Sequence, residues 1–458
     1  MSFPAYPGYK HSEVELLGEF PDHWTLKRFK NVFGERAERS TDGTEELLSV
    51  SAYFGIKPRS ETLDEGDHLS RAESLEGYKV CQAGDLVINI MLAWNRGLGF
   101  SWQRGIVSPA YCVFYVTDGS VPKFLDYLVR SDECIRYFKT HSAGIMDSRL
   151  RLYPESFGRL FTAIPPPCEQ TQIARFLDHE TARIDALIEE QQRLIELLKE
   201  KRHAVISHAV TKGLDPTVPM KDSGVEWLGE VPVHWAIKRL KQLVLDAAGI
   251  QMGPFGGMLV DLDDSDTGYK VYGQENTISG DFSSGNRWVP ESRYFALSNY
   301  HLEVGDIVLT RKGSLGNCRR VSLLPQAGII DSDTIRVRVQ DQMMNPDYLE
   351  LLLHEAGYIS IQLSLVKRGA ILSGLNSEII ANLVIVVPPP DGQEELLLEI
   401  KAASSKFDQG ISDCEYAVGL LRERRSALIS AAVTGKIDVR GWQPPARAKA
   451  PVLEAEAV

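Results

Sequence analysis

The sequence predicts an α+β protein with an internal tandem duplication, in which two globular, mostly-β domains are separated by two long helices paired as an antiparallel coiled coil. The first supporting observation is a repeat: residues 10–30 and 221–241 share 13 of 21 positions without a gap. The second is a triple proline, in IPPP at 164–167 and VPPP at 387–390, followed in each half by a long segment with helical periodicity. A repeat of this length indicates one structural unit used twice.

The repeated blocks lie at the two ends of each half, and the middle of each half differs. Residues 201–211 match 424–434 at seven of 11 positions, and GDLVI at 84–88 corresponds to GDIVL at 305–309. Two copies keep what both need, such as packing and partner docking, and diverge in what differs between them. The pattern therefore predicts two copies of one scaffold that recognise two different things.

Each globular part is predicted to be built on short strands with a few helices. A Gly-Asp turn precedes a β-branched run in both copies, while residues 124–142 and 348–365 have helical periodicity. Proline cannot continue a strand ladder, so each triple proline marks a boundary. The predicted parts are a first domain, a first spacer helix, a second domain, a second spacer helix and a disordered tail, at 1–163, 164–213, 214–386, 387–438 and 439–458.

The long helices carry apolar residues at heptad spacing. In the first helix these are Leu177, Ile184, Leu187, Leu194, Leu198 and Val205, and in the second they are Ile400, Phe407, Leu421 and Leu428. Glycines at 213 and 435 are expected to end the helices. Residues 214–220 are too short for a parallel return, which favours antiparallel pairing. The alternative is that each helix packs on its own domain.

Composition limits the class of protein. Of 458 residues, 43% are apolar and 24% charged, as in folded soluble proteins, and there is no apolar run of the ~20 residues that cross a membrane. No secretion signal is recognised at the start, and the six cysteines form no CxxC pair, so a bacterial or archaeal cytoplasm is expected. The net charge of −12 by itself argues mildly against a nucleic-acid partner.

The sequence contains no recognisable catalytic motif, so no catalytic residue, bound cofactor or metal is predicted on this chain. A P-loop, HExxH, GxSxG and the motifs of amino-methyltransferases are absent. The repeated His23-Trp24 and His234-Trp235 pairs are interpreted as packed aromatics with hydrogen-bonded histidines. The acidic residues Asp261, Asp263 and Asp264 are interpreted as a solvated loop rather than a metal site.

Basic side chains collect in the divergent middles, where they favour nucleic-acid binding over the alternative of a solvated charged face. Arginine contacts guanine edges in a bidentate manner, and lysine holds phosphates. The candidate DNA-binding residues are Arg96, Arg104, Arg149 and Arg151 in the first half, and Arg311, Lys312, Arg319, Arg320, Lys367 and Arg368 in the second.

Taken together, the ordered blocks resemble the specificity subunit of type I restriction-modification systems. The likeness covers residues 5–438 and is carried by YKHSEVELLGEFPDHW, MKDSGVEWLGEVPVHW, the two Gly-Asp segments, and IPPPCEQTQIARFLD and VPPPDGQEELLLEI. EELLLEIKAASSKFD at 394–408 departs from TQIARFLDHETARID at the corresponding place in the first copy.

The resemblance implies two target recognition domains, each recognising one half of a bipartite, asymmetric site in double-stranded DNA. It implies that the helices set the spacing and dock two methyltransferase subunits, and that restriction and translocation subunits join them. S-adenosylmethionine and ATP with Mg²⁺ are then expected on those partners.

Two alternative functions are left open by the sequence. One is a nuclease or methyltransferase with a degenerate site, and the other is a coiled-coil scaffold that spaces two protein-binding domains. A salt-dependent loss of DNA binding would separate the first interpretation from the scaffold.

Overall fold

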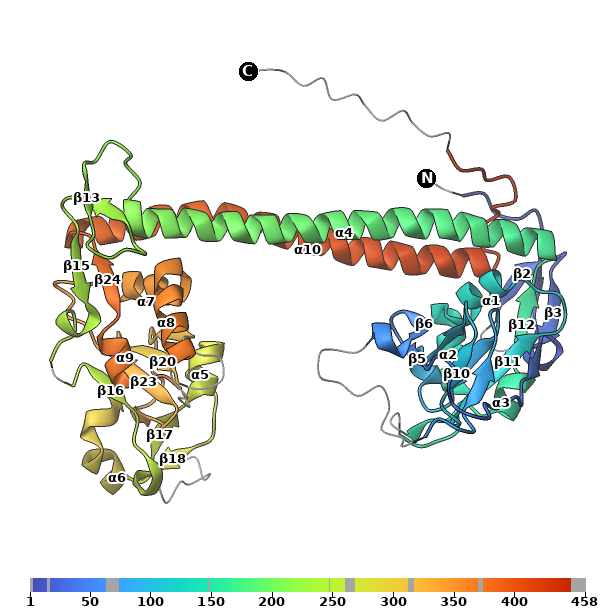
Figure 1. Ribbon diagram of the computed structural model, residues 1–458, viewed down its shortest axis with the longest axis horizontal. Coiled ribbons are helices and arrows are strands. Elements are labelled where there is room, and N and C mark those ends of the chain that lie inside the picture. Colours follow the sequence, from blue (N-terminus) through green and yellow to red (C-terminus); the bar gives the residue numbers. More distant parts are fainter. Residues whose placement is uncertain are drawn as a thin grey trace. The chain divides into compact units, whose positions relative to one another are not determined.

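The structure is a computed structural model that describes residues 3–14, 17–62, 74–146, 149–246, 248–259, 268–311, 317–369 and 374–445 (Figure 1). The side chains of 365–369 also lie outside this description. The chain divides into two compact units, Met1–Gln191 with Tyr416–Val458, and Gln192–Glu415. Each unit contains one globular domain and part of both long helices.

The first domain is built around a four-stranded antiparallel sheet in the order β4-β11-β8-β9. Its strands are β4 (Phe33–Glu35), β8 (Leu86–Asn89), β9 (Leu98–Phe100) and β11 (Tyr111–Val116). Four strand pairs surround it: β1 (Tyr9–His11) with β2 (Glu19–Pro21), β3 (Thr25–Arg28) with β12 (Phe161–Ile164), β5 (Leu48–Ser51) with β6 (Gly55–Pro58), and β7 (Lys79–Cys81) with β10 (Gly105–Val107). The helices are α1 (Pro122–Val129), α2 (Asp132–Thr140) and α3 (Pro154–Arg159).

The second domain has the corresponding sheet in the order β16-β23-β20-β21. These strands are β16 (Ile250–Met252), β20 (Ile307–Thr310), β21 (Cys318–Arg320) and β23 (Thr334–Val337). A second sheet follows the order β18 (Trp288–Val289), β17 (Tyr269–Tyr272), β22 (Gly328–Ile330) and β19 (His301–Leu302), and β13 (Met220–Asp222) pairs with β14 (Glu230–Pro232), as does β15 (Ala236–Arg239) with β24 (Val384–Val387). The helices are α5 (Gln274–Ser279), α6 (Glu291–Ala296), α7 (Pro346–Glu355), α8 (Gly357–Gly369) and α9 (Ser377–Ala381).

The predicted duplication and the α+β class are confirmed by this topology. The strand before each triple proline pairs with the strand after each His-Trp block, as β12·β3 and β15·β24. β5 corresponds to β17, since Leu47 just before β5 bridges Ile106 of β10 in parallel, as Val271 of β17 pairs with Ile329 of β22. Each then pairs antiparallel with the next strand, β6 or β18, but α5 lies between β17 and β18 and has no counterpart in the short β5–β6 hairpin. The differences therefore lie in the middles of the two halves.

The repeated Gly-Asp turn holds an Asp–Arg ion pair in both copies, although Arg36 follows β4 and Arg338 follows β23, which corresponds to β11. Gly84 and Gly305 have φ values of +90° and +96°, which favour glycine, and the aspartate that follows is buried. Asp85 accepts a hydrogen bond from Arg36 Nε at 2.6 Å, and Asp306 accepts one from Arg338 Nε at 2.7 Å. These arginines therefore serve the fold.

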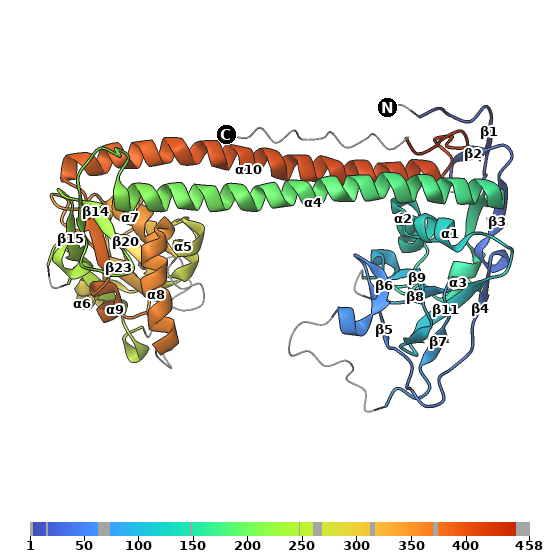
Figure 2. The ribbon, with the colours of Figure 1, turned by 45° about the horizontal axis from the view of Figure 1, so that its top comes forward.

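The long helices are α4 (Pro167–Lys212) and α10 (Pro390–Val433), which pair antiparallel (Figures 1 and 2). In the first unit, Asp185 in the first half of α4 pairs with Arg425 in the last quarter of α10, with Nε and Oδ1 2.8 Å apart. In the second unit, Arg202 pairs with Asp408 at 2.8 Å. The two ion pairs are related by the repeat.

The heptad register predicted for these helices is wrong at several positions. Leu187, Leu194 and Val205 are exposed, whereas Ile184, Ile195 and Ile206 are buried. These three isoleucines recur every 11 residues, a spacing of about 3.67 per turn that stays closer to the straight α-helix than a heptad does. The heptad assignment failed because leucines occur on both faces of α4, and because Ile206 near its end packs in the core of the second domain rather than only on a partner helix.

A buried glutamine anchors the start of each long helix to its own domain. Gln170 accepts a hydrogen bond from the Val121 backbone N–H at 2.6 Å and donates to the Pro165 carbonyl at 2.8 Å. Gln393 does the same with the Asn345 N–H and the Pro388 carbonyl, at 2.8 and 3.0 Å. The amide thereby satisfies backbone groups that proline-rich chain leaves without partners.

The His-Trp block of the first copy packs as predicted. Trp24 is buried and donates to Glu169 Oε1 at 2.8 Å, while a ring nitrogen of His23 lies 2.7 Å from Glu169 Oε2. The Tyr6 hydroxyl donates to the same carboxylate at 2.6 Å, and burial together with this bond raises the pKa of Tyr6. These contacts are structural.

The prediction of a disordered tail at 439–458 needs correction for its first residues. Val439 is fully buried, and the Trp442 ring packs edge-on against Phe176 with centroids 5.2 Å apart. The tail is predicted to be disordered from its overall content of Ala, Pro and charged residues, which gives no weight to these two apolar side chains. They cover the first turns of α4. Residues 446–458 lie outside the described residues. Among the helices described, none has the length and apolar character needed to span a bilayer.

Candidate nucleic-acid interface

The four basic residues predicted in the first domain occupy different surroundings. Arg96, with a left-handed φ of +61°, donates to the Arg130 carbonyl at 2.5 Å and pairs with Asp132. Arg104 lies 3.7 Å from Glu38 and 3.6 Å from Glu45. Arg149 is exposed, and Arg151 donates to the Leu150 carbonyl at 3.0 Å. Of these four, Arg96 lines the large cavity described next.

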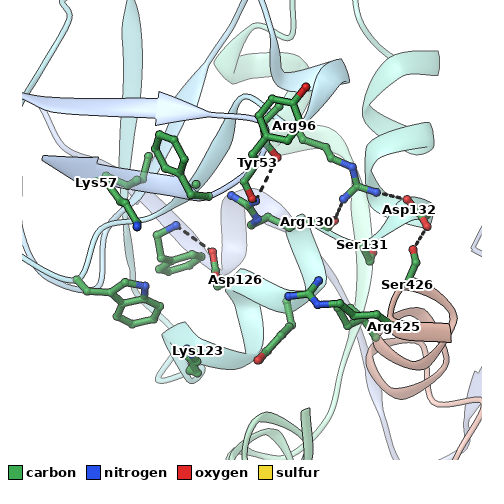
Figure 3. Close-up of a pocket in the computed structure, with 18 of the residues that line it drawn as sticks. Tyr53, Lys57, Arg96, Lys123, Asp126, Arg130, Ser131, Asp132, Arg425 and Ser426 are labelled. Carbon is green, nitrogen blue, oxygen red and sulfur yellow. Dashed lines mark hydrogen bonds and ion pairs between the residues drawn. The ribbon is translucent and has the colours of Figure 1, made fainter. Parts of the chain in front are cut away.

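A cavity of about 730 Å³ opens between the β5–β6 hairpin, the junction of α1 with α2, and α10 (Figure 3). We call it the first-domain cleft. Its lining has an excess of positive charge, with six basic side chains against the carboxylates of Asp126 and Asp132. The basic residues are Lys57, Arg96, Lys123, Arg130, Arg422 and Arg425.

Arg130 fixes the hairpin to the body of the domain. Its guanidinium donates to the carbonyls of Leu98, Ala52 and Tyr53, at 3.0, 3.3 and 3.2 Å. Gly55, with φ of +81°, gives the guanidinium room, because a Cβ there would lie 2.4 Å from Nη1. A side chain at position 55 would therefore displace Arg130 or the hairpin.

The charges in the cleft affect one another. Burial lowers the pKa of the Arg130 guanidinium, Asp126 opposes this, and the nearby cations Arg96 and Arg425 lower the pKa further. Burial also raises the pKa of Asp126, against the opposing effect of Arg130. Mutual repulsion between cations favours an anion in this cleft.

Aromatic side chains stand at the mouth of the cleft. Tyr53 at the hairpin tip is 94% exposed, and Phe54 and Trp102 are about half exposed. Lys57 lies 5.6 Å from the Phe54 ring centroid and Lys123 5.2 Å from that of Trp102. Cations hold phosphates, and exposed aromatic rings beside them can stack on a base that has left the base stack.

The repeat supplies a comparison for one of these cations. Arg425 and Arg202 occupy equivalent positions of α10 and α4. Arg202 also makes two hydrogen bonds to Glu355, at 2.8 and 3.0 Å. No such second carboxylate is described at Arg425, whose side chain points from α10 into the cleft (Figure 3).

The Arg202–Glu355 contact predicts a pH-dependent stability. Hydrogen bonds from His354 and Arg202 lower the pKa of Glu355 to about 2, so its stabilisation is complete above the ordinary value of 4.5 and is lost as pH falls toward 2. We expect Glu355→Gln to lower the free energy of unfolding at pH 7 by about 1–3 kcal/mol. Urea unfolding at pH 7, 5 and 3 should show that the difference in unfolding free energy between the variant and wild type becomes smaller as the pH falls.

The matched control for this prediction is Glu190→Gln, since Glu190 is exposed on α4 and no partner of it is described. It should unfold like wild type throughout. If Glu355→Gln lowered the free energy of unfolding as much at pH 3 as at pH 7, the stabilisation could not be assigned to the ionised carboxylate.

The basic residues predicted in the second domain are largely engaged within it. Arg311 donates to the carbonyls of Leu375 and Ser332, at 3.1 and 3.3 Å, and lies 4.9 Å from the Phe255 ring. Arg319 lies 4.0 Å from Glu350, and Arg320 donates to Asp347 at 2.9 Å. Lys312 and the side chains of Lys367 and Arg368 lie outside the described residues.

Sequence analysis missed five of the six basic residues in the cleft, namely Lys57, Lys123, Arg130, Arg422 and Arg425. They are spread over some 370 positions, and Arg422 and Arg425 lie in a helix predicted as a spacer. A usable signal was present in the repeat, because Arg202 and Arg425 occupy the same position of the repeated block at 201–211 and 424–434.

A metal site is not apparent in the described part of the chain, which holds no group of three His, Cys, Asp or Glu side chains that could bind an ion. The acidic stretch at 261–264 lies outside the described residues.

Comparison with known proteins agrees with this architecture, although no protein-family model matches the chain. The specificity subunit of the type I restriction enzyme EcoKI from Escherichia coli strain K12 is 22% identical over 325 residues, which is 70% of this chain and 66%, just under two thirds, of that protein. A solved chain from a study of complex assembly and conformational transition of the type I R-M system has a TM-score of 0.65 at 15% identity, covering 90% of this chain and 98% of that one. The HsdS subunit from Thermoanaerobacter tengcongensis has a TM-score of 0.50 at 17% identity, covering 91% and 98%.

The fold is thus that of a duplicated α+β protein with two globular domains and a pair of long antiparallel helices. The resemblance predicted from the sequence, to specificity subunits of type I restriction-modification systems, is confirmed by these matches in sequence and in fold.

Proposed function

We propose that the chain is the DNA sequence-recognition subunit of a type I restriction-modification enzyme. The observation that carries the proposal is one chain with two copies of a framework whose middles differ. Because the framework is shared and the middles are not, each domain recognises its own short sequence. The target is then a bipartite, asymmetric site in double-stranded DNA.

The charge distribution supports a DNA partner in spite of the net charge of −12. DNA responds to the local field of a groove rather than to the sum over the chain. The first-domain cleft offers six cations beside exposed aromatic side chains.

The long helices supply the surface for partner subunits. In the first unit, Leu187 and Leu420 are exposed and line an open groove of about 320 Å³ with Ala417 and Leu421. Apolar side chains on paired helices suit the helices of another subunit. We assign this surface to methyltransferase subunits, with restriction subunits joining the complex; S-adenosylmethionine and ATP with Mg²⁺ would bind to those partners. The chain itself carries no catalytic role in this proposal.

The proposal is tested by mapping methylated adenines in the genome of the source strain, with the chain present, deleted and restored. We expect one bipartite motif to lose methylation on deletion and to regain it on restoration. An unchanged methylation map would overturn the proposal. Binding of the assembled complex to duplex DNA should also weaken steeply with salt, which a scaffold between protein-binding domains would not show.

A further inference from the structure

We propose that the first-domain cleft binds phosphate groups of the recognised DNA, and that Arg425 of the spacer helix α10 supplies one of the contacts. The inference rests on the proposed function and deepens it, because it places a DNA contact on an element otherwise assigned to spacing and docking. The ligand chemistry is a phosphate ester beside a base.

The charge of the cleft favours an anionic ligand. Arg96 is paired with Asp132, and Lys123 lies 3.3 Å from Asp178 of α4. Lys57 and Arg422 have no carboxylate ion pair within the described part of the chain, and Arg130 has only the longer-range attraction of Asp126. A cluster of cations left without counter-ions is costly unless an anion binds, and guanidinium groups bind phosphate oxygens in bidentate geometry.

Comparison of the two copies shows that Arg202 and Arg425 have different partners. Arg202 and Arg425 each use Nε for the ion pair between the helices, with Asp408 and Asp185. In the second unit Glu355 occupies Nη1 and Nη2 of Arg202. In the first unit α2 presents instead Asp132, which is bonded to Arg96 and Ser426. If this arginine served only to pair the helices, a second carboxylate could neutralise it in both copies. Arg425 lacks the carboxylate that Arg202 has, which points to a use for the terminal nitrogens of Arg425.

The shape and lining of the cleft suit a nucleotide within a polymer. A volume of about 730 Å³ accepts a nucleotide, and Tyr53 extends from the hairpin tip at its mouth. Arg96 has an uncommon left-handed backbone in the lining, and such conformations gather at binding sites. The exposed rim favours a polymer such as DNA over a free nucleotide, because a free nucleotide is usually more enclosed by its site.

The experiment compares Arg425→Gln with Asp185→Asn in the complex of the full chain with its methyltransferase subunits. Both substitutions break the same ion pair between the helices, but only the first removes the cation. We expect Arg425→Gln to weaken binding of the cognate duplex by roughly tenfold. The slope of log K against log salt should fall by about 0.9 for the lost phosphate contact. Asp185→Asn should keep the wild-type slope.

Two further variants make the test independent of helix pairing. Lys57→Gln, on the hairpin and remote in sequence from both helices, should lower the slope in the same way. Arg202→Gln, at the equivalent position of the other unit, should leave it unchanged. Wild-type slopes for both Arg425→Gln and Lys57→Gln would overturn the cleft proposal.

The outcomes separate this proposal from the proposed function. If the wild-type complex bound the cognate duplex no better than unrelated DNA, the proposed function would fail. If wild type bound specifically and the cleft variants matched it, only the cleft assignment would fail. Titration with ATP covers the other source of phosphate: tight ATP binding that Arg425→Gln abolishes, with DNA binding unchanged, would overturn the assignment to DNA.

Discussion

Exchange of residues 31–160 for the corresponding segment of another specificity subunit is expected to change one half of the methylated motif and leave the other half intact. The segment lies between β3 and β12, whose pairing joins the framework of the first domain. It includes the β5–β6 hairpin and most of the first-domain cleft. Because the framework and the helices are kept, assembly should be unaffected and methylation should remain at full level on a new motif.

The matched control is the corresponding exchange in the second half, between β15 and β24, at residues 242–383. It should change the other half of the motif. Methylome sequencing of strains that carry either exchange measures both results. A change in both halves from one exchange would contradict recognition by two separate domains.

Lengthening both long helices is expected to lengthen the unread gap between the two half-sites. Seventeen positions separate Asp185 from Arg202 in α4, and likewise Asp408 from Arg425 in α10, so the two stretches between the ion pairs match in length. Inserting four residues after Arg193 and four after Tyr416 adds one turn, or ~6 Å, to each stretch. With ~3.4 Å per base pair, the gap should grow by one or two base pairs.

The control places the same four residues after Gly213. α4 ends at Lys212, and Gly213 has a φ of +78° in the turn that follows, so this insertion lengthens the connection but not the helix. The methylated motif should then keep its spacing. A longer gap from the loop insertion, or an unchanged gap from the paired helix insertions, would show that the helices do not set the spacing.

The framework of this protein could be predicted from its sequence because local chemistry determines it. The Gly-Asp turns need a positive φ before a β-branched strand, the triple prolines end a strand, and the repeat assigns the same roles in both halves. The His-Trp block is similar, since a tryptophan kept at the same position of both copies is expected in a core.

Tertiary structure alone decided the rest. Ile195 and Ile206 are buried while Leu194 and Val205 are exposed, and Ile206 is covered by the core of the second domain, so tertiary packing selects the buried face that the leucines leave open. Val439 and Trp442 order the start of the tail because the apolar surface of α4 lies beside them. The first-domain cleft gathers Lys57, Arg130 and Arg425 from distant parts of the chain, and the charge left at Arg425 depends on which carboxylates the fold brings near it. Sequence by itself therefore determined the repeated framework, whose interactions are local, and the fold determined the charged surface, whose interactions join residues remote in the chain.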